Sequence, residues 1–228
     1  MADALWEKVI SSGGSPGSPG DNVVFDKEGN AYMTGYFSGD MHVDGYHLRS
    51  VDRSNDMFVA KFGSDGRAHW LKSLGSPGND IGLTVHMDQD EQNVYVSGSF
   101  TEDVHVGSAT YDVGEDGDIV LTKLSSEGKL VWANQAGLKN LEQKDNLMFT
   151  TSFSSEGKRN WTRLYEQMES YTSFGIELDK AGNPFVKGAV YATPGFTLAA
   201  KAYERYAEMD YVENLKEQTE QLVDQQYN

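Results

Sequence analysis

Two stretches of the sequence read as copies of one another and decide the expected fold. The first is Asp26-Lys27-Glu28-Gly29-Asn30-Ala31-Tyr32-Met33-Thr34-Gly35, and the second is Asp88-Gln89-Asp90-Glu91-Gln92-Asn93-Val94-Tyr95-Val96-Ser97-Gly98. A third copy is Asp179-Lys180-Ala181-Gly182-Asn183-Pro184-Phe185-Val186-Lys187-Gly188. In each copy an aromatic residue follows the Asn by two positions, and a Gly lies three positions further on. Because Asp, Gly and Asn suit a tight turn, and alternating apolar residues follow, each copy predicts a β-hairpin.

A second pattern lies between these copies and predicts another hairpin. In it a strand-like run leads to a turn of the form Ser-acid-Gly, and a Trp follows the Gly by four residues. The runs are 56–62, 118–124 and 147–153, and their turns and tryptophans are Ser64-Asp65-Gly66 with Trp70, Ser126-Glu127-Gly128 with Trp132, and Ser155-Glu156-Gly157 with Trp161. Two hairpins per unit, with a period near 60, predict a four-stranded blade of a β-propeller.

These motifs resemble a known bacterial repeat. Asn30–Gly39, Asn55–Phe62 and Gly66–Trp70, repeated from Asn93 to Trp132, are similar to the SBBP (seven-bladed β-propeller) repeat family. The resemblance covers residues 15–136 well and 145–190 in part. It implies a propeller fold, a lean towards exported or envelope-associated proteins, and no catalytic residues to carry over.

The repeat is irregular after Trp132. Trp70 and Trp132 are 62 residues apart, whereas Trp132 and Trp161 are only 29 apart, so half a unit is missing between Gly137 and Asp145. The expected fold class is therefore all-β, with antiparallel, propeller-like blades that form an incomplete or irregular propeller, and a C-terminal α-helix. We expect a propeller-repeat domain at 1–192 and a helix at 193–228; the blades lie at about 15–75 and 76–137, with partial blades at 138–168 and 169–192. Such a set either closes irregularly with the strand around Trp6, pairs its open edges with a partner, or belongs to a longer protein.

The C-terminal region changes character. Phe196–Gln226 contains no Pro or Gly, and apolar residues recur at helical spacing. The helix either packs on the propeller, projects as a tail, or pairs with another helix. In the last case the interaction residues are Met209, Val212, Leu215 and Leu222.

Composition limits the function. The chain of 228 residues has a formal charge of −16 and no Cys. This charge argues against non-specific nucleic-acid binding, and the absence of Cys excludes disulfides and thiol chemistry. No run approaches the roughly 20 apolar residues of a membrane-spanning helix, and the start of the chain lacks the pattern of a signal peptide. The compartment is not determined.

A search for catalytic constellations finds none, so we expect no enzyme and no required cofactor. The acidic clusters are the best indication of a ligand, because Ca²⁺ prefers carboxylate oxygens. The candidate metal ligands are Asp88, Asp90, Asp112 and Asp116; the alternative is that these side chains form turns and solvated surface. The leading hypothesis is a non-catalytic module for protein–protein interaction, whose partner is another protein or a second copy. The alternative is a surface module that binds Ca²⁺ or carbohydrate.

Overall fold

A computed structural model describes residues 11–12, 22–114, 117–138, 147–166 and 175–190. This part of the chain is all-β, with antiparallel strand pairs and a single 3₁₀ turn, η1 (Val51–Arg53). No helix within it is long and apolar enough to cross a bilayer. The expected C-terminal helix at 193–228 and the strand around Trp6 lie outside the described residues.

Three four-stranded sheets form the body of the molecule, and none of them is closed. The first sheet has the order β2 (Val23–Phe25), β3 (Ala31–Ser38), β6 (Asn55–Phe62) and β7 (Ala68–Leu74). The second has the order β8 (Ile81–Met87), β9 (Asn93–Phe100), β12 (Asp118–Ser125) and β13 (Leu130–Gln135). Both follow the two predicted hairpins in chain order.

The third sheet contains the same two hairpins in reversed chain order. Its order is β16 (Gly175–Leu178), β17 (Pro184–Val190), β14 (Leu147–Phe153) and β15 (Arg159–Glu166). The sequence assigned these hairpins to two separate partial blades, but β14 and β17 pair along six residues, with Thr151 opposite Val186. Each half-unit leaves an edge with free N–H and C=O groups, and the pairing satisfies both edges.

Two further hairpins are inserted at the same point of the first two sheets, between the second and third strands. They are β4 (Asp40–Val43) with β5 (Tyr46–Arg49), and β10 (Val104–Val106) with β11 (Ala109–Tyr111). The short strand β1 (Ser11–Ser12) pairs with β4.

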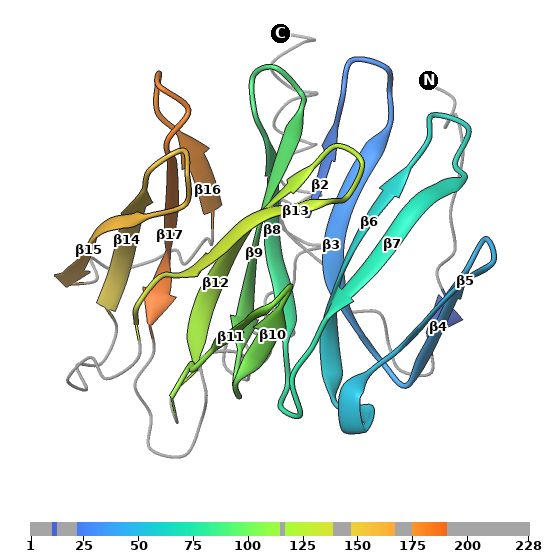
Figure 1. The fold of residues 1–228 in the computed structure, drawn as a ribbon, viewed down its shortest axis with the longest axis horizontal. Helices are drawn as coiled ribbons and strands as arrows, with labels where there is room; N and C mark the ends of the chain where they lie inside the picture. The colour runs from blue at the N-terminus through green and yellow to red at the C-terminus, as the bar shows by residue number, and fades with distance from the viewer. Residues whose placement is uncertain (1–10, 13–21, 115–116, 139–146, 167–174, 191–228) are drawn as a thin grey trace, which may run out of the picture.

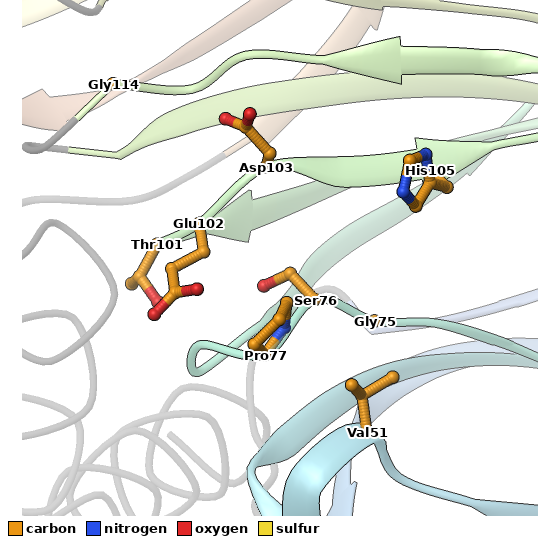
Figure 2. Close-up of a pocket in the computed structure, with 9 residues that line it drawn as sticks. All are labelled: Val51, Gly75, Ser76, Pro77, Thr101, Glu102, Asp103, His105 and Gly114. Carbon is orange, nitrogen blue, oxygen red and sulfur yellow. The ribbon is translucent and has the colours of Figure 1, made fainter.

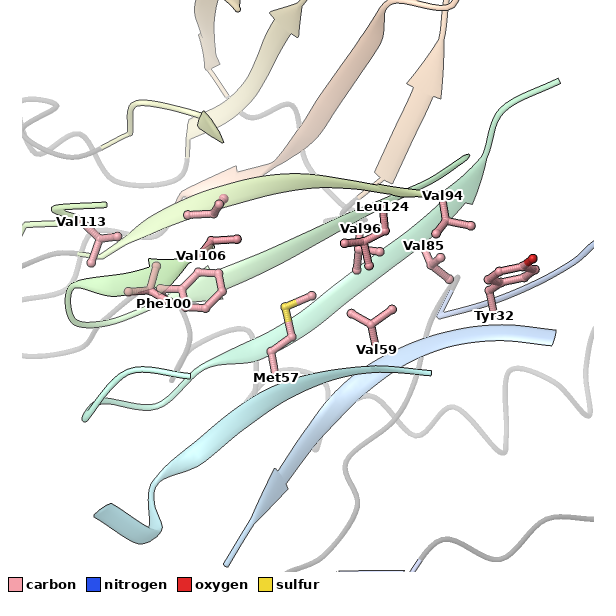
Figure 3. Packing of buried hydrophobic residues seen from close by; sticks show 12 residues of the cluster. Tyr32, Met57, Val59, Val85, Val94, Val96, Phe100, Val106, Val113 and Leu124 are labelled. Carbon is pink, nitrogen blue, oxygen red and sulfur yellow. The ribbon is translucent and has the colours of Figure 1, made fainter. Parts of the chain in front are cut away.

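The three sheets lie side by side (Figure 1) and bury apolar residues between them. Between the first and second sheets, Tyr32, Met57 and Val59 pack against a group from the second sheet that includes Val85 and Val96 (Figure 3). Between the second and third sheets, the buried residues are Leu83, Tyr95, Ile119 and Leu121 on one side and Phe149, Phe153, Ile176 and Val186 on the other. Successive residues of a strand point to opposite faces of the sheet, and in the central sheet both sets are apolar. The central sheet is therefore packed on both faces.

Candidate interaction surface

A tryptophan of one sheet contacts a turn of the next sheet at both interfaces. Trp70 Nε1 donates a hydrogen bond to the carbonyl of Ser126 at 3.1 Å, and Trp132 Nε1 donates one to the carbonyl of Ser155 at 3.0 Å. We call this arrangement the Trp–turn contact. The spacing of the tryptophans predicts that Trp70, Trp132 and Trp161 pack between neighbouring blades; Trp70 and Trp132 do lie between neighbouring sheets, whereas no described sheet covers Trp161.

The glycine of each Ser-acid-Gly turn makes room for the indole ring. A Cβ atom on Gly128 would lie 2.8 Å from Cδ2 of Trp70, and one on Gly157 would lie 2.7 Å from Cγ of Trp132. Both glycines also have positive φ, at +75° and +86°. Glycine is therefore required at this turn position for two reasons: the turn needs a positive φ, and the indole ring leaves no room for a Cβ atom.

Additional donors surround each Trp–turn contact. Lys61 Nζ lies 4.9 Å from the centre of the Tyr32 ring and 3.4 Å from the carbonyl of Ser126. At the second interface, the Asn134 amide donates to the carbonyl of Gly157 at 2.8 Å. The preceding sheet thus supplies aromatic rings and donors, and the following sheet supplies backbone acceptors.

The third sheet presents the same surface on its outward side. Trp161 occupies the position of Trp70 and Trp132, and Phe185 that of Tyr32 and Tyr95. The Trp161 and Phe185 rings lie 5.9 Å apart, and the Arg163 guanidinium lies 4.6 Å from the Trp161 ring centre. The Lys187 ammonium, on the same side, pairs with Glu177. We call the surface of Thr150, Trp161, Arg163, Phe185 and Lys187 the open face.

Exposure separates the open face from its two counterparts. Tyr32 and Tyr95 are 0% and 1% exposed beneath the next sheet, whereas Phe185 is only half-buried and Arg163 is exposed. Within the described part of the chain, no sheet covers the open face and Trp161 Nε1 has no hydrogen-bond acceptor. The signal in the sequence was the spacing of Gly157 and Trp161, which reasoning from the sequence alone did not connect with an uncovered surface.

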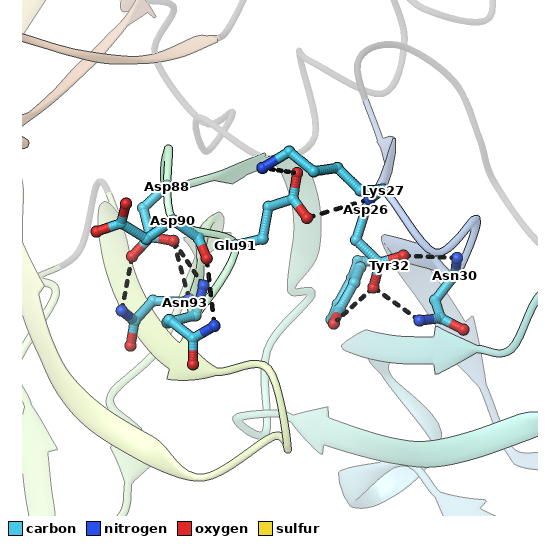
Figure 4. A network of polar contacts seen from close by, with 9 residues as sticks. Asp26, Lys27, Asn30, Tyr32, Asp88, Asp90, Glu91 and Asn93 are labelled. Carbon is cyan, nitrogen blue, oxygen red and sulfur yellow. Dashed lines mark hydrogen bonds and ion pairs between the residues drawn. The ribbon is translucent and has the colours of Figure 1, made fainter.

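The candidate metal ligand Asp88 belongs to a turn that recurs in all three sheets, and Figure 4 shows the turns of the first two. Its carboxylate accepts bonds from the Asn93 amide nitrogen at 3.1 Å and from Asn93 Nδ2 at 2.6 Å. Asp26 binds Asn30, and Asp179 binds Asn183, in the same manner. The side-chain hydrogen bond from Asn183 also lowers the pKa of Asp179. The predicted hairpin turns are confirmed, and the Asp88 oxygens already have partners within the turn.

The three candidate metal ligands that the structure describes do not meet in one place. Asp88 and Asp90 precede β9, while Asp112 follows the hairpin beyond its other end, so about 25 Å of strand separates them. Asp88 and Asp90 line a cavity of about 290 Å³ that also contacts Lys123 and Asp179. Asp116 and the candidate interaction residues Met209, Val212, Leu215 and Leu222 lie outside the described residues. Among the residues that the structure describes, no group of three or more His, Cys, Asp or Glu side chains could hold a metal ion.

A larger cavity of about 850 Å³ lies between the first and second sheets, at the end where the inserted hairpins are found (Figure 2). Glu102, Asp103 and His105 lie on one side of it, and Val51 and Ser76 on the other. All three of the first group are exposed. No sequence motif predicts this cavity, because its lining comes from separate loops.

Two buried carboxyl groups hold the loops beside this cavity. Asp80, 0% exposed, accepts a bond from the Ser76 hydroxyl at 2.8 Å, and Asp56, 1% exposed, accepts one from the Val51 amide at 3.2 Å. Burial raises the pKa of Asp80 to about 7, and the nearby Asp56 carboxyl adds to this rise. Burial likewise raises the pKa of Asp56 to about 6. The hydrogen bonds that Asp80 and Asp56 accept from these loops account for two carboxyl groups being buried here.

Asp118 holds the corresponding loop of the second sheet. It is 0% exposed and accepts backbone bonds from Ile119, Gly137 and Leu138 at 2.7, 3.1 and 3.0 Å. Burial nevertheless raises its pKa to about 6. Asp56 and Asp118 occupy equivalent positions near the start of β6 and β12, opposite Phe37 and Phe100, which agrees with a structural role for this repeated acid.

No protein-family model matches the chain, and no curated protein matches it either. The resemblance to the SBBP repeats therefore stays a prediction from the residues that carry it.

Proposed function

We propose that this chain is a non-catalytic β-propeller-repeat module for protein–protein interaction or assembly, with its three sheets arranged as blades of an incomplete propeller. The observation that carries the proposal is the open face. It repeats the donor side of two buried interfaces, yet no described sheet covers it. A half-buried Trp and Phe beside an Arg are also the residue types that dominate binding energy at protein interfaces.

The chemistry of the open face indicates the kind of partner. At both internal interfaces the indole N–H binds a carbonyl of a Ser-acid-Gly turn, and the turn glycine lies against the ring. Arg163 stands where Asn134 donates to the turn. The proposed partner is therefore a further β-sheet with an acidic, glycine-containing turn, carried by a second copy of the chain or by another protein.

The alternative, a surface module that binds Ca²⁺ or carbohydrate, has less support. The Asp88 oxygens already bind Asn93, and Asp88 and Asp112 lie at opposite ends of β9. Calorimetry with Ca²⁺ and with a glycan panel tests this alternative directly.

The proposal is tested by comparing Trp161→Ala with Trp132→Ala. Trp132→Ala removes an occupied contact between sheets and is expected to destabilise the protein by about 3 kcal/mol. Trp161→Ala is expected to change the unfolding free energy by less than about 1 kcal/mol, because no sheet among the described residues covers that ring. Light scattering is expected to show concentration-dependent association of the wild type that Trp161→Ala abolishes.

Two results would contradict the proposal. Equal destabilisation by both variants would mean that the open face is already covered within the chain. Association that Trp161→Ala leaves unchanged would place the interface elsewhere. If the wild type is a monomer and Trp161→Ala is as stable as the wild type, a second copy is excluded as the partner. The proposed partner is then another protein.

A further inference from the structure

The inserted hairpins of the first two sheets cover the outermost strand of their own sheet. Tyr46, the first residue of β5, donates from its hydroxyl to the carbonyl of His69 on β7 at 2.5 Å. Tyr111, at the end of β11, donates in the same manner to the carbonyl of Ala133 on β13 at 2.7 Å. Each hairpin therefore occupies backbone groups on the free edge of the sheet from which it arises.

Polar side chains add to this cover. The Asp44 carboxylate accepts a bond from the Ala68 amide of β7 at 2.8 Å. The Gln135 side chain of β13 donates to the carbonyl of Asp112 at 2.6 Å. Covering of this kind prevents an edge strand from pairing with other chains.

The outermost strand of the third sheet, β15, has no such cover among the described residues. No described strand pairs with its outer edge. Leu164 and Tyr165 on this strand are 37% and 46% exposed, whereas Ala136, which takes the position of Tyr165 in the second sheet, is 0% exposed. β15 thus presents apolar side chains on an unpaired edge.

The chain that could cover β15 begins at the matching place. The inserted segments 39–54 and 101–117 leave the second strand of the first and second sheets, β3 and β9. In the third sheet the second strand is β17, and the chain that leaves it is residues 191–228. This segment is longer than either inserted segment, so its length suffices to reach the edge.

The composition of residues 191–228 suits β15. The segment carries seven acidic and three basic side chains, while β15 and its turn carry Lys158, Arg159 and Arg163 against Glu156 and Glu166, so the two net charges are opposite in sign. Its predicted helix also has an apolar stripe to set against Leu164 and Tyr165. We propose that residues 191–228 cover the outer edge of β15 and so protect the third sheet from pairing with other chains. This inference concerns the edge, not the open face, so it does not rest on the proposed function.

Spin labels on the full chain test the inference cleanly, because the chain has no native Cys. One pair of labels combines Lys201→Cys with Asn160→Cys on β15. The matched control combines Lys201→Cys with His69→Cys, the equivalent exposed position on β7. The first pair is expected to give a short, narrow distance distribution. The control distance is expected to be longer by about 20 Å, because two sheet-to-sheet spacings separate β7 from β15.

A charge reversal checks the electrostatic part. Lys158→Glu is expected to broaden the Lys201–Asn160 distances, whereas Lys129→Glu, at the same turn position of the second sheet, is expected to leave them unchanged. Broad distributions of equal length for both label pairs would overturn the inference. A short distance seen only between two singly labelled chains would overturn it as well, because a second copy would then cover the edge. Neither outcome depends on Trp161, so failure here leaves the proposed function to its own test.

Discussion

Substitution of Gly157 by Ala tests whether the Trp–turn contact holds the second and third sheets together. A Cβ atom there would lie 2.7 Å from both Cγ and Cε3 of Trp132, closer than the van der Waals limit. Gly182 is the matched control, because its φ of +79° is close to the +86° of Gly157 and nothing lies within 4 Å of its added Cβ. Both variants therefore share the backbone strain of a left-handed Ala, about 1–2 kcal/mol.

Only Gly157→Ala also moves the indole ring. Forcing a ring out of a packed position costs about 1–3 kcal/mol, and weakening the bond from Trp132 to Ser155 adds about 1 kcal/mol. Gly157→Ala is therefore expected to lower the unfolding free energy by about 2–4 kcal/mol more than Gly182→Ala.

Urea unfolding measured by circular dichroism gives these free energies from the midpoint and slope. In a Trp132→Ala background the additional loss caused by Gly157→Ala is expected to disappear, because the two residues are in contact and their effects are not additive. Equal destabilisation by Gly157→Ala and Gly182→Ala would refute the reasoning. So would a loss at Gly157 that persists without the indole ring.

Two further predictions concern single groups. Trp70→Phe keeps a ring but removes the bond to Ser126, so urea unfolding should show a loss of about 1 kcal/mol; no loss would mean that the bond is dispensable. The second concerns pH. Asp80 and Asp118 have pKa values of about 7 and about 6 in the folded protein, against about 3.9 in an unfolded chain. The folded state therefore binds more protons between these values, and stability should fall as pH rises from about 4 to 7. Asp80→Asn should flatten this slope, whereas Asp65→Asn, at an exposed turn, should not; an unchanged slope in Asp80→Asn contradicts the assignment.

Local patterns in the sequence predicted the features that depend on neighbouring residues. The Asp–Asn turns, the Ser-acid-Gly turns and the position of Trp70 between two sheets all follow from short motifs with a physical reason for each residue. The pairing of β14 with β17 did not follow, because any free strand edge accepts any other and no local residue marks the choice.

The site was predicted less well than the fold. The open face depends on which of the described sheets lies last in the row, and that is decided by pairing between distant strands. The burial of Asp80 and its bond to Ser76 could not be predicted either, because no sequence pattern distinguishes a buried Asp that holds a loop from an exposed Asp. The acidic cluster around Asp88 suggested metal ligands, and the structure shows that the Asp88 oxygens bind Asn93 within a turn.

The reversed order of hairpins in the third sheet also decides how the row of sheets could grow. From the first sheet to the second, the polypeptide passes from a fourth strand, β7, to the first strand of a new sheet, β8. After β15 it turns back instead and completes the sheet it has just left. Among the described residues, the backbone therefore does not step outward from the third sheet to a further one, and the outermost position of the row is held by a strand whose chain has already turned back.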